Sequence, residues 1–113
     1  MKELSKDEVI RYLADLTSFE RSVLLATLDI PKGKVSTYKR IAERIGRPNA
    51  YRAVGNALKK NPAPSLIPCH RVVRSDGRLG GEQKRAERRR KILRQEGIVF
   101  VGDKVKLTKK VLF

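Results

Sequence analysis

Residues 36–58 read STYKRIAERIGRPNAYRAVGNAL, and this stretch decides the fold. From Ser36 onward the apolar residues recur at helical spacing in two short runs, and Gly46-Arg47-Pro48 separates them. Two short amphipathic helices joined by a turn of about three or four residues with a glycine are typical of a helix-turn-helix motif. An ordinary helical hairpin is the alternative. The apolar positions are Tyr38, Ile41, Ala42 and Ile45 in the first run and Ala50, Ala53, Val54, Ala57 and Leu58 in the second.

The second run has the composition of a helix that enters a groove of nucleic acid. Ala50, Ala53 and Gly55 are small, so a polynucleotide backbone can approach them closely. Tyr51 and Arg52 lie among these small residues in the sequence. We therefore expect these five residues to contact nucleic acid.

The chain carries a strong positive charge, because 27 Lys and Arg against 12 Asp and Glu give a formal net charge of +15 over 113 residues. Self-repulsion of this kind disfavours a compact chain unless a polyanion or counterions offset it, and nucleic acid is the leading partner. A membrane surface is the competing polyanion, but no apolar run approaches the ~20 residues of a spanning helix and the N-terminus lacks a signal-peptide core. We expect a monomer without membrane association that is cytoplasmic, and nucleoid-associated in a prokaryote or nuclear in a eukaryote.

The rest of the chain predicts short elements within a single domain, residues 1–113. Residues 5–8, Ser-Lys-Asp-Glu, have the form of a capping box, and Thr17 or Ser18 suits the start of a second helix that Pro31 and Gly33 end. The expected fold class is mostly α with small β elements, containing a winged-helix-like helix-turn-helix. The expected elements are helices at 6–16, 19–28 and 82–95 with Gly97 as a C-cap, a strand at 72–73, a turn at 75–77, and a hairpin of 98–101 with 104–107.

The predicted helix at 82–95 has a thin apolar face and several basic residues. A run of charge is usually a solvated face, and the alternative is a surface that follows phosphates. Because the whole chain is so basic, we favour phosphate contact. The basic residues are Lys84, Arg85, Arg88, Arg89, Arg90, Lys91 and Arg94, against Glu87.

The only cysteine and the only histidine of the chain are neighbours, Cys69 and His70. A cysteine reacts as its thiolate, which a nearby base or positive charge favours, and His70 with Arg71 could supply both. The alternatives are a small buried hydrophobic residue and a satisfied core histidine. Successive side chains of an extended segment point to opposite faces, so His70 need not touch the sulfur and is free to act through water or a third residue.

Neither a disulfide nor a metal is expected to hold the fold. A single cysteine forms no internal disulfide, and one Cys with one His does not make a usual structural zinc site. We therefore expect hydrophobic packing to supply the stability.

Several short motifs occur in a fixed order along the chain, and together they resemble the catalytic domain of the O6-alkylguanine-DNA alkyltransferases over about residues 19–100. The Pro-Cys-His-Arg-Val core is the most specific of them. The motifs are Ile30-Pro31-x-Gly33, Ser36-x-Tyr38, Ile45-Gly46-x-Pro48, Arg52-Ala53-Val54-Gly55, Asn61-Pro62, Ile67-Pro68-Cys69-His70-Arg71-Val72-Val73 and Glu96-Gly97.

The resemblance implies that Cys69 takes an alkyl group directly from O6 of a damaged guanine and keeps it as a thioether, once per molecule and without a cofactor. It also implies that His70 acts through water as the base for Cys69 and that Glu96 orients His70. Asn61 would brace the cysteine loop by hydrogen bonding. Local readings compete for two of these residues, because Glu96 lies near a helix end and Asn61 precedes a proline.

The resemblance further implies that the second helix lies in the minor groove of double-stranded DNA and that the target nucleotide is flipped out of the stack. Arg52 would fill the vacated space, and Tyr38 would contact the base or assist rotation of its phosphate. Arg71 is expected among the DNA-binding residues. A surface phosphate contact for Arg52 and a half-buried aromatic for Tyr38 are the plainer alternatives.

One part of the family pattern is missing. Many members have Tyr-x-Gly-Gly after the cysteine loop as a wall of the alkyl pocket, and this chain has Glu82-Gln83-Lys84-Arg85 there. We expect Tyr38, Val72, Gly80 and Gly81 to line the pocket instead. Some small relatives lack the cysteine and bind alkylated DNA without repairing it, so a lesion sensor is the alternative function. A sequence-specific helix-turn-helix regulator is a third.

Overall fold

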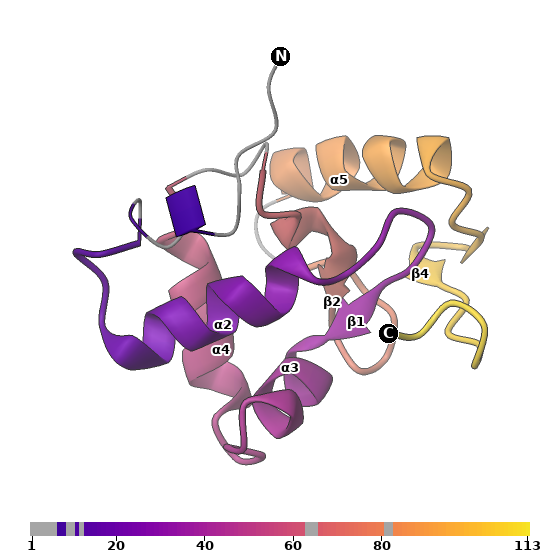
Figure 1. Ribbon diagram of the computed structural model, residues 1–113. Coiled ribbons are helices and arrows are strands. Elements are labelled where there is room, and N and C mark those ends of the chain that lie inside the picture. Colours follow the sequence, from indigo (N-terminus) through magenta and orange to yellow (C-terminus); the bar gives the residue numbers. More distant parts are fainter. Residues whose placement is uncertain (1–6, 9–10, 12, 63–65, 81–82) are drawn as a thin grey trace.

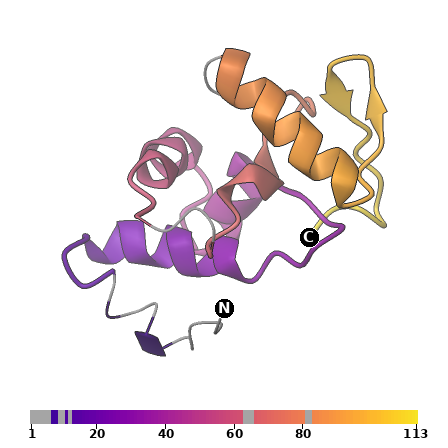
Figure 2. The same ribbon diagram turned by 90° about the horizontal axis from the view of Figure 1, so that it is seen from above.

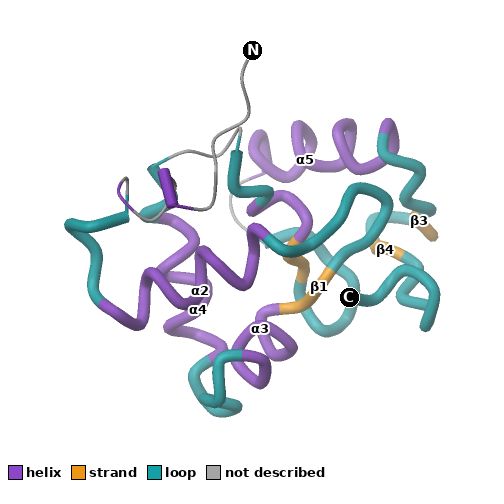
Figure 3. Tube along the Cα trace, viewed as in Figure 1, coloured by secondary structure: helices purple, strands orange, loops and turns teal. Residues whose placement is uncertain are grey.

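The structure is a computed structural model that describes residues 7–8, 11, 13–62, 66–80 and 83–113 (Figure 1). Helices predominate, as the tube in Figure 3 shows. Each strand is two residues long, so the expected fold class is confirmed. The elements are α2 (Ser18–Leu28), β1 (Ser36–Thr37), α3 (Tyr38–Arg44), α4 (Tyr51–Lys59), the 3-10 turn η1 (Cys69–Arg71), β2 (Val72–Val73), α5 (Gln83–Gln95), β3 (Phe100–Val101) and β4 (Lys104–Val105).

Helix α2 begins where the sequence places it. The Thr17 side chain accepts from the backbone N–H of Glu20 at 3.1 Å, and the Glu20 carboxylate accepts from the Thr17 N–H at 3.0 Å, which completes a capping box. Lys60, next to the end of α4, approaches the same carboxylate at 2.7 Å. The start of α2 is thus tied to the end of the second helix of the helix-turn-helix.

The helix expected at 6–16 is wrong at its C-terminal end. Residues 13–16 form a turn and a bend, with i to i+3 hydrogen bonds such as Leu16 N–H to Leu13 C=O at 3.0 Å. The chain has to leave a helical path here because Thr17, as the N-cap of α2, has an extended backbone. Asp7, Glu8 and Arg11 are helical, whereas Ser5, Lys6, Val9 and Tyr12, and with them the expected capping box, lie outside the described residues.

The helix-turn-helix is confirmed as α3 and α4. Ser36 and Thr37 are extended, so the first helix begins at Tyr38, and the Thr37 hydroxyl caps it by accepting from the Arg40 N–H. Helix α3 ends where Gly46 N–H donates to Glu43 C=O and Arg47 N–H donates to Ala42 C=O, the two hydrogen bonds of a Schellman motif. Helix α4 then packs against both α2 and α3.

Strands β1 and β2 pair in parallel, with Ser36 opposite Val72 and Thr37 opposite Val73. This short pairing joins the entry to the helix-turn-helix to the segment that follows Cys69 and His70. Residues far apart in sequence therefore meet at the junction of α3 and η1.

The buried apolar residues in the described part of the chain form two clusters. Figure 2 shows the corresponding parts, with α5 and the β3–β4 hairpin on one side of the molecule and α2 and α4 on the other. The hairpin is shorter than expected, and the strand at 72–73 and the turn before Gly77 are as expected. The first cluster includes Leu13, Val23, Leu24, Ile41, Val54, Leu58, Ile67 and Val72, and the second is Val35, Val73, Leu93, Ile98 and Val105.

None of the helices in the described part of the chain combines the length and the apolar character needed to cross a bilayer.

Candidate active site

Cys69 begins the 3-10 turn η1 and is partly buried against the first core cluster. The turn is tight, because the Cys69 N–H donates to the Ile67 carbonyl at 2.8 Å and the Arg71 N–H donates to the Pro68 carbonyl at 2.9 Å. Asn61, which follows α4, donates from Nδ2 to the same Ile67 carbonyl at 3.0 Å. The end of α4 is thereby connected to the loop that carries the sulfur, which is the contact that the family resemblance implies for Asn61.

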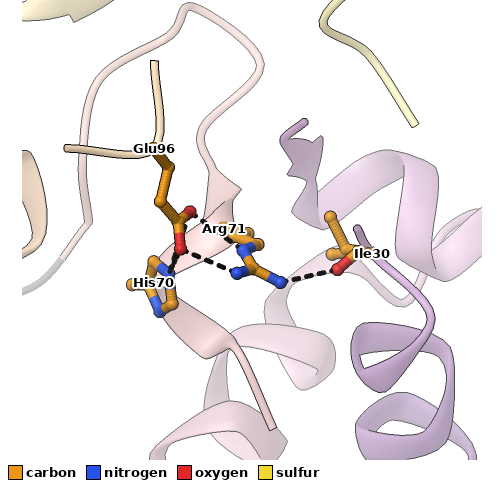
Figure 4. Close-up of polar contacts among 4 residues, drawn as sticks. All are labelled: Ile30, His70, Arg71 and Glu96. Atoms are coloured by element: carbon orange, nitrogen blue, oxygen red, sulfur yellow. Dashed lines mark hydrogen bonds and ion pairs between the residues drawn. The ribbon is translucent and has the colours of Figure 1, made fainter. Parts of the chain in front are cut away.

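His70 and Arg71 share one carboxylate, that of Glu96 (Figure 4). His70 Nε2 lies 3.2 Å from Glu96 Oε2, and Arg71 donates to both carboxylate oxygens, from Nε at 2.9 Å and from Nη2 at 2.7 Å. Arg71 also donates from Nη1 to the Ile30 carbonyl at 2.9 Å. The three side chains are only 10–17% exposed, so water screens these contacts weakly.

Glu96 reaches this position because α5 ends in a defined way. Gly97 N–H donates to Arg94 C=O and Ile98 N–H donates to Leu93 C=O, both at 3.0 Å, which makes a second Schellman motif. Gly97 has φ +89°, a conformation that side chains with a Cβ rarely adopt. Leu93 and Ile98 are both buried in the second core cluster. The C-cap therefore fixes Glu96 between α5 and η1.

The site favours an ionised Glu96 beside a neutral His70. The hydrogen-bonded Arg71 guanidinium holds the pKa of Glu96 below its usual value. The pKa of His70 lies below its usual value, with burial as the largest cause; the Glu96 carboxylate acts to raise it, and the charges of Arg71 and Arg89 act to lower it. A neutral imidazole that donates from Nε2 to Glu96 keeps a lone pair on Nδ1, so it can accept a proton.

A cavity of about 340 Å³ opens beside Cys69, and a smaller one of about 80 Å³ connects Cys69 with Tyr38 and Gly55. The sequence prediction did not include the α5 side chains of this wall. The sequence spacing of these residues could have indicated that they line one surface together, because positions 85, 88, 89 and 92 fall on one face of a helix. The larger cavity is lined by Leu58, Lys59, Asn61, Cys69, His70, Arg85, Arg88, Arg89 and Ile92.

The expected pocket residues are only partly brought together. Tyr38 reaches the smaller cavity and lies against Gly80, where an added Cβ would come within 2.6 Å of the Tyr38 hydroxyl. The prediction for Val72 is wrong: this residue is 1% exposed and packs in the first core cluster, because β2 pairs with β1 and buries it. Gly81 and Glu82 lie outside the described residues.

Helix α4 presents Tyr51, Arg52 and Ala53 to solvent, while Ala50 and Gly55 are half-buried. The aromatic side chain of Tyr51 is 47% exposed. Arg71, which we expected to bind DNA with them, is not on this face, since it directs Nε and both Nη groups to Glu96 and Ile30. The structure therefore gives Arg71 the position of a brace within the site.

Known proteins are similar to this chain in sequence and in fold. The family model for the DNA binding domain of 6-O-methylguanine DNA methyltransferase matches residues 18–98. The methylated-DNA–protein-cysteine methyltransferase of Methanosarcina barkeri is 55% identical over 65 residues, which are 58% of this chain and 41% of that protein. The chain spans about half the length of the curated relatives it matches.

Two solved structures are similar over most of the chain. The crystal structure of Schizosaccharomyces pombe Atl1 in complex with damaged DNA containing O6-carboxymethylguanine has a TM-score of 0.73 and 32% identity, and the match covers 84% of this chain and 94% of Atl1. That of Mycobacterium tuberculosis OGT in complex with DNA has a TM-score of 0.67 and 42% identity over 71% of this chain and 50% of that one. On its sequence and its fold, the chain belongs to the family of the 6-O-methylguanine DNA methyltransferase DNA binding domain.

Proposed function

We propose that this chain repairs DNA directly, by moving an alkyl group from O6 of guanine to Sγ of Cys69. The observation that carries the proposal is the position of Cys69 on the wall of a cavity that also exposes His70, whose imidazole is held neutral beside Glu96. Displacement at a saturated carbon needs a polarisable nucleophile, and a thiolate is the best that a protein provides near neutral pH. The curated names of the relatives support the same activity.

The step balances without a cofactor. The Cys69 thiol loses its proton to His70 through water, Sγ bonds to the alkyl carbon, and the bond from that carbon to O6 breaks. The electron pair of the broken bond stays on the guanine, which takes up a proton in turn. The product is a thioether that has no hydrolysable acyl bond, so each molecule reacts once.

Double-stranded DNA is the proposed partner. Tyr51, Arg52 and Ala53 are exposed in the first turn of α4, and the chain has a formal charge of +15. An alkylated guanine in a duplex is out of reach of a partly buried sulfur, so the nucleotide must be flipped at a cost of a few kcal/mol. We assign the wedge that replaces it to Arg52, with α4 in the minor groove and Tyr38, which reaches the smaller cavity, beside the flipped base.

The second candidate is a lesion sensor that binds alkylated DNA and leaves it unchanged. The similarity to Atl1 favours it, since that match covers nearly the whole of Atl1, whereas the matches to Mycobacterium tuberculosis OGT and to the methyltransferase of Methanothermobacter thermautotrophicus cover about half of each protein. The presence of Cys69 favours transfer.

Intact-mass measurement separates the two candidates. The protein is incubated with a duplex carrying one O6-methylguanine, and transfer predicts a gain of one methylene unit per molecule that peptide mapping places on Cys69. Cys69→Ser should still bind the duplex and gain no mass. Selective binding by the wild type without any gain would establish the sensor instead.

A further inference from the structure

The cavity beside Cys69 is strongly cationic. Four basic side chains line it, Lys59 from α4 and Arg85, Arg88 and Arg89 from α5, and the described lining residues include no carboxylate. Lys59, Arg85 and Arg89 also line the smaller cavity, together with Cys69. A group that enters either cavity toward the sulfur therefore lies among positive charges.

Arg89 is held in place rather than free. Its Nη1 donates to the Gly80 carbonyl at 3.1 Å and its side chain is partly buried. It lines the cavity together with His70, and its charge contributes to lowering the pKa of the imidazole. A guanidinium that the protein already holds in one orientation loses little conformational freedom when it binds an anion.

The other arginines of α5 point elsewhere. Arg90 and Arg94 lie over the Phe100 ring, at 5.8 and 5.6 Å from its centroid. The arginines of α5 thus divide between the cavity and the hairpin. The arginines that line the cavity are therefore not simply part of an evenly solvated helix surface.

A methyl group gains nothing from guanidinium groups, whereas a carboxylate matches their planar fork with two charge-assisted hydrogen bonds. The carboxylate of a carboxymethyl group is one bond beyond the carbon that reacts with Sγ. It must therefore enter the same cavity as the reacting carbon.

Building on the proposed alkyl transfer, we infer that the cavity selects O6-alkyl groups that bear a carboxylate, and that Arg85, Arg88 and Arg89 determine this specificity. In the transfer, Sγ bonds to the methylene carbon, the carbon–O6 bond breaks toward guanine, and Cys69 becomes S-carboxymethylated. The phosphate of the flipped nucleotide is a second anion that these arginines could bind. The experiment has to separate the two anions.

Single-turnover transfer is measured by protein mass with three duplexes that differ only in the O6 group: methyl, carboxymethyl, or the neutral and similarly sized carbamoylmethyl. The double variant Arg85→Gln/Arg88→Gln should slow transfer from carboxymethyl about tenfold relative to carbamoylmethyl. The ratio of the carboxymethyl rate to the carbamoylmethyl rate in the variant is divided by the same ratio in the wild type, which cancels the different intrinsic reactivity of the two groups. Arg94→Gln removes the same charge from the hairpin face and should leave the ratio unchanged.

The same ratio is then measured with the free O6-alkylguanine bases, which carry no phosphate. A ratio that again falls in the double variant supports the inference. Equal slowing of all three duplexes, with the free bases unaffected, would assign the arginines to phosphate and overturn it. Transfer from methyl with an unchanged ratio overturns the inference but leaves the proposed function intact, whereas no transfer from any lesion overturns both.

Discussion

Arg71 makes a bidentate ion pair with the carboxylate of Glu96, donating from Nε to Oε1 at 2.9 Å and from Nη2 to Oε2 at 2.7 Å, while His70 contacts the same carboxylate. The third nitrogen of Arg71 holds the Ile30 carbonyl just beyond α2. One guanidinium thus links the segment after α2, the cysteine turn and the end of α5. The orientation of His70 depends on this link.

Arg71→Met should destabilise the protein by about 2–3 kcal/mol, because it leaves the largely buried Glu96 without its strongest partner. Arg71→Lys keeps the charge but loses the two-point contact, so it should recover only part of the loss. Urea unfolding measures both. The control is Arg78→Met, which breaks an exposed ion pair of 3.8 Å with Asp76 and should cost at most about 0.5 kcal/mol. Equal losses in Arg71→Met and Arg78→Met would contradict the brace.

Stability should fall as the pH drops below the ordinary histidine value of 6.5, because the folded state holds the pKa of His70 lower than the unfolded chain does. Unfolding then takes up a proton, so the free energy of unfolding is largest above pH 6.5 and declines below it. The lowered pKa of Glu96 removes further stability only below its ordinary value of 4.5.

The loss of stability just below pH 6.5 is assigned to His70, since the chain contains a single histidine. Urea midpoints between about pH 7.5 and pH 5 should therefore decline in the wild type and stay nearly flat in His70→Gln. A wild-type midpoint that rises on acidification over this range would show that the imidazole is stabilised in its charged form.

Gly80→Ala should displace Tyr38, because the new Cβ would lie 2.6 Å from the tyrosine hydroxyl. We expect a cost of about 1 kcal/mol in unfolding free energy and slower alkyl transfer. In a Tyr38→Phe background the oxygen is gone, so the same substitution should cost much less, and a double-mutant cycle on unfolding measures the difference.

The control is Gly55→Ala, whose Cβ would meet the Tyr38 ring at 3.8 Å, an ordinary contact. It should stabilise the free protein by about 0.5–1 kcal/mol, because alanine suits the interior of α4 better than glycine. In the double-mutant cycle of Gly80→Ala with Tyr38→Phe, additive changes in unfolding free energy would show that Gly80 and Tyr38 do not interact.

Arg52→Ala should slow repair of a duplex about tenfold or more, while reaction with the free alkylated base should be unchanged, because only the duplex requires a wedge. Arg47→Ala is the matched control, since it removes an exposed positive charge from the turn of the same helix-turn-helix. It should weaken duplex binding through phosphates without lowering the rate at saturating DNA. Single-turnover rates at saturation make the comparison, and equal losses on duplex and free base would remove Arg52 from the flipping step.

The sequence by itself determined the local structure and the reactive centre. Helical spacing, the Thr17–Glu20 capping box and the glycines at the ends of α3 and α5 act over a few residues, so α2, the helix-turn-helix and α5 could be predicted from them. The order of the motifs around Cys69 and His70 indicated the family before any contact was known. The end of the first expected helix failed because the turn into the N-cap of α2 overrides helical spacing at Leu13 and Leu16.

The tertiary structure decided which side chains join Cys69, His70, Asn61 and Glu96 in the site and which expected ones do not. The parallel pairing of β1 with β2 buries Val72, and the packing of α5 against η1 brings Glu96 to Arg71 across 25 residues of sequence. The same packing turns Arg85, Arg88 and Arg89 toward Cys69. Periodicity shows that these arginines lie on one face of a helix, but what that face meets depends on long-range burial of Leu93 and Ile98, which no local pattern encodes.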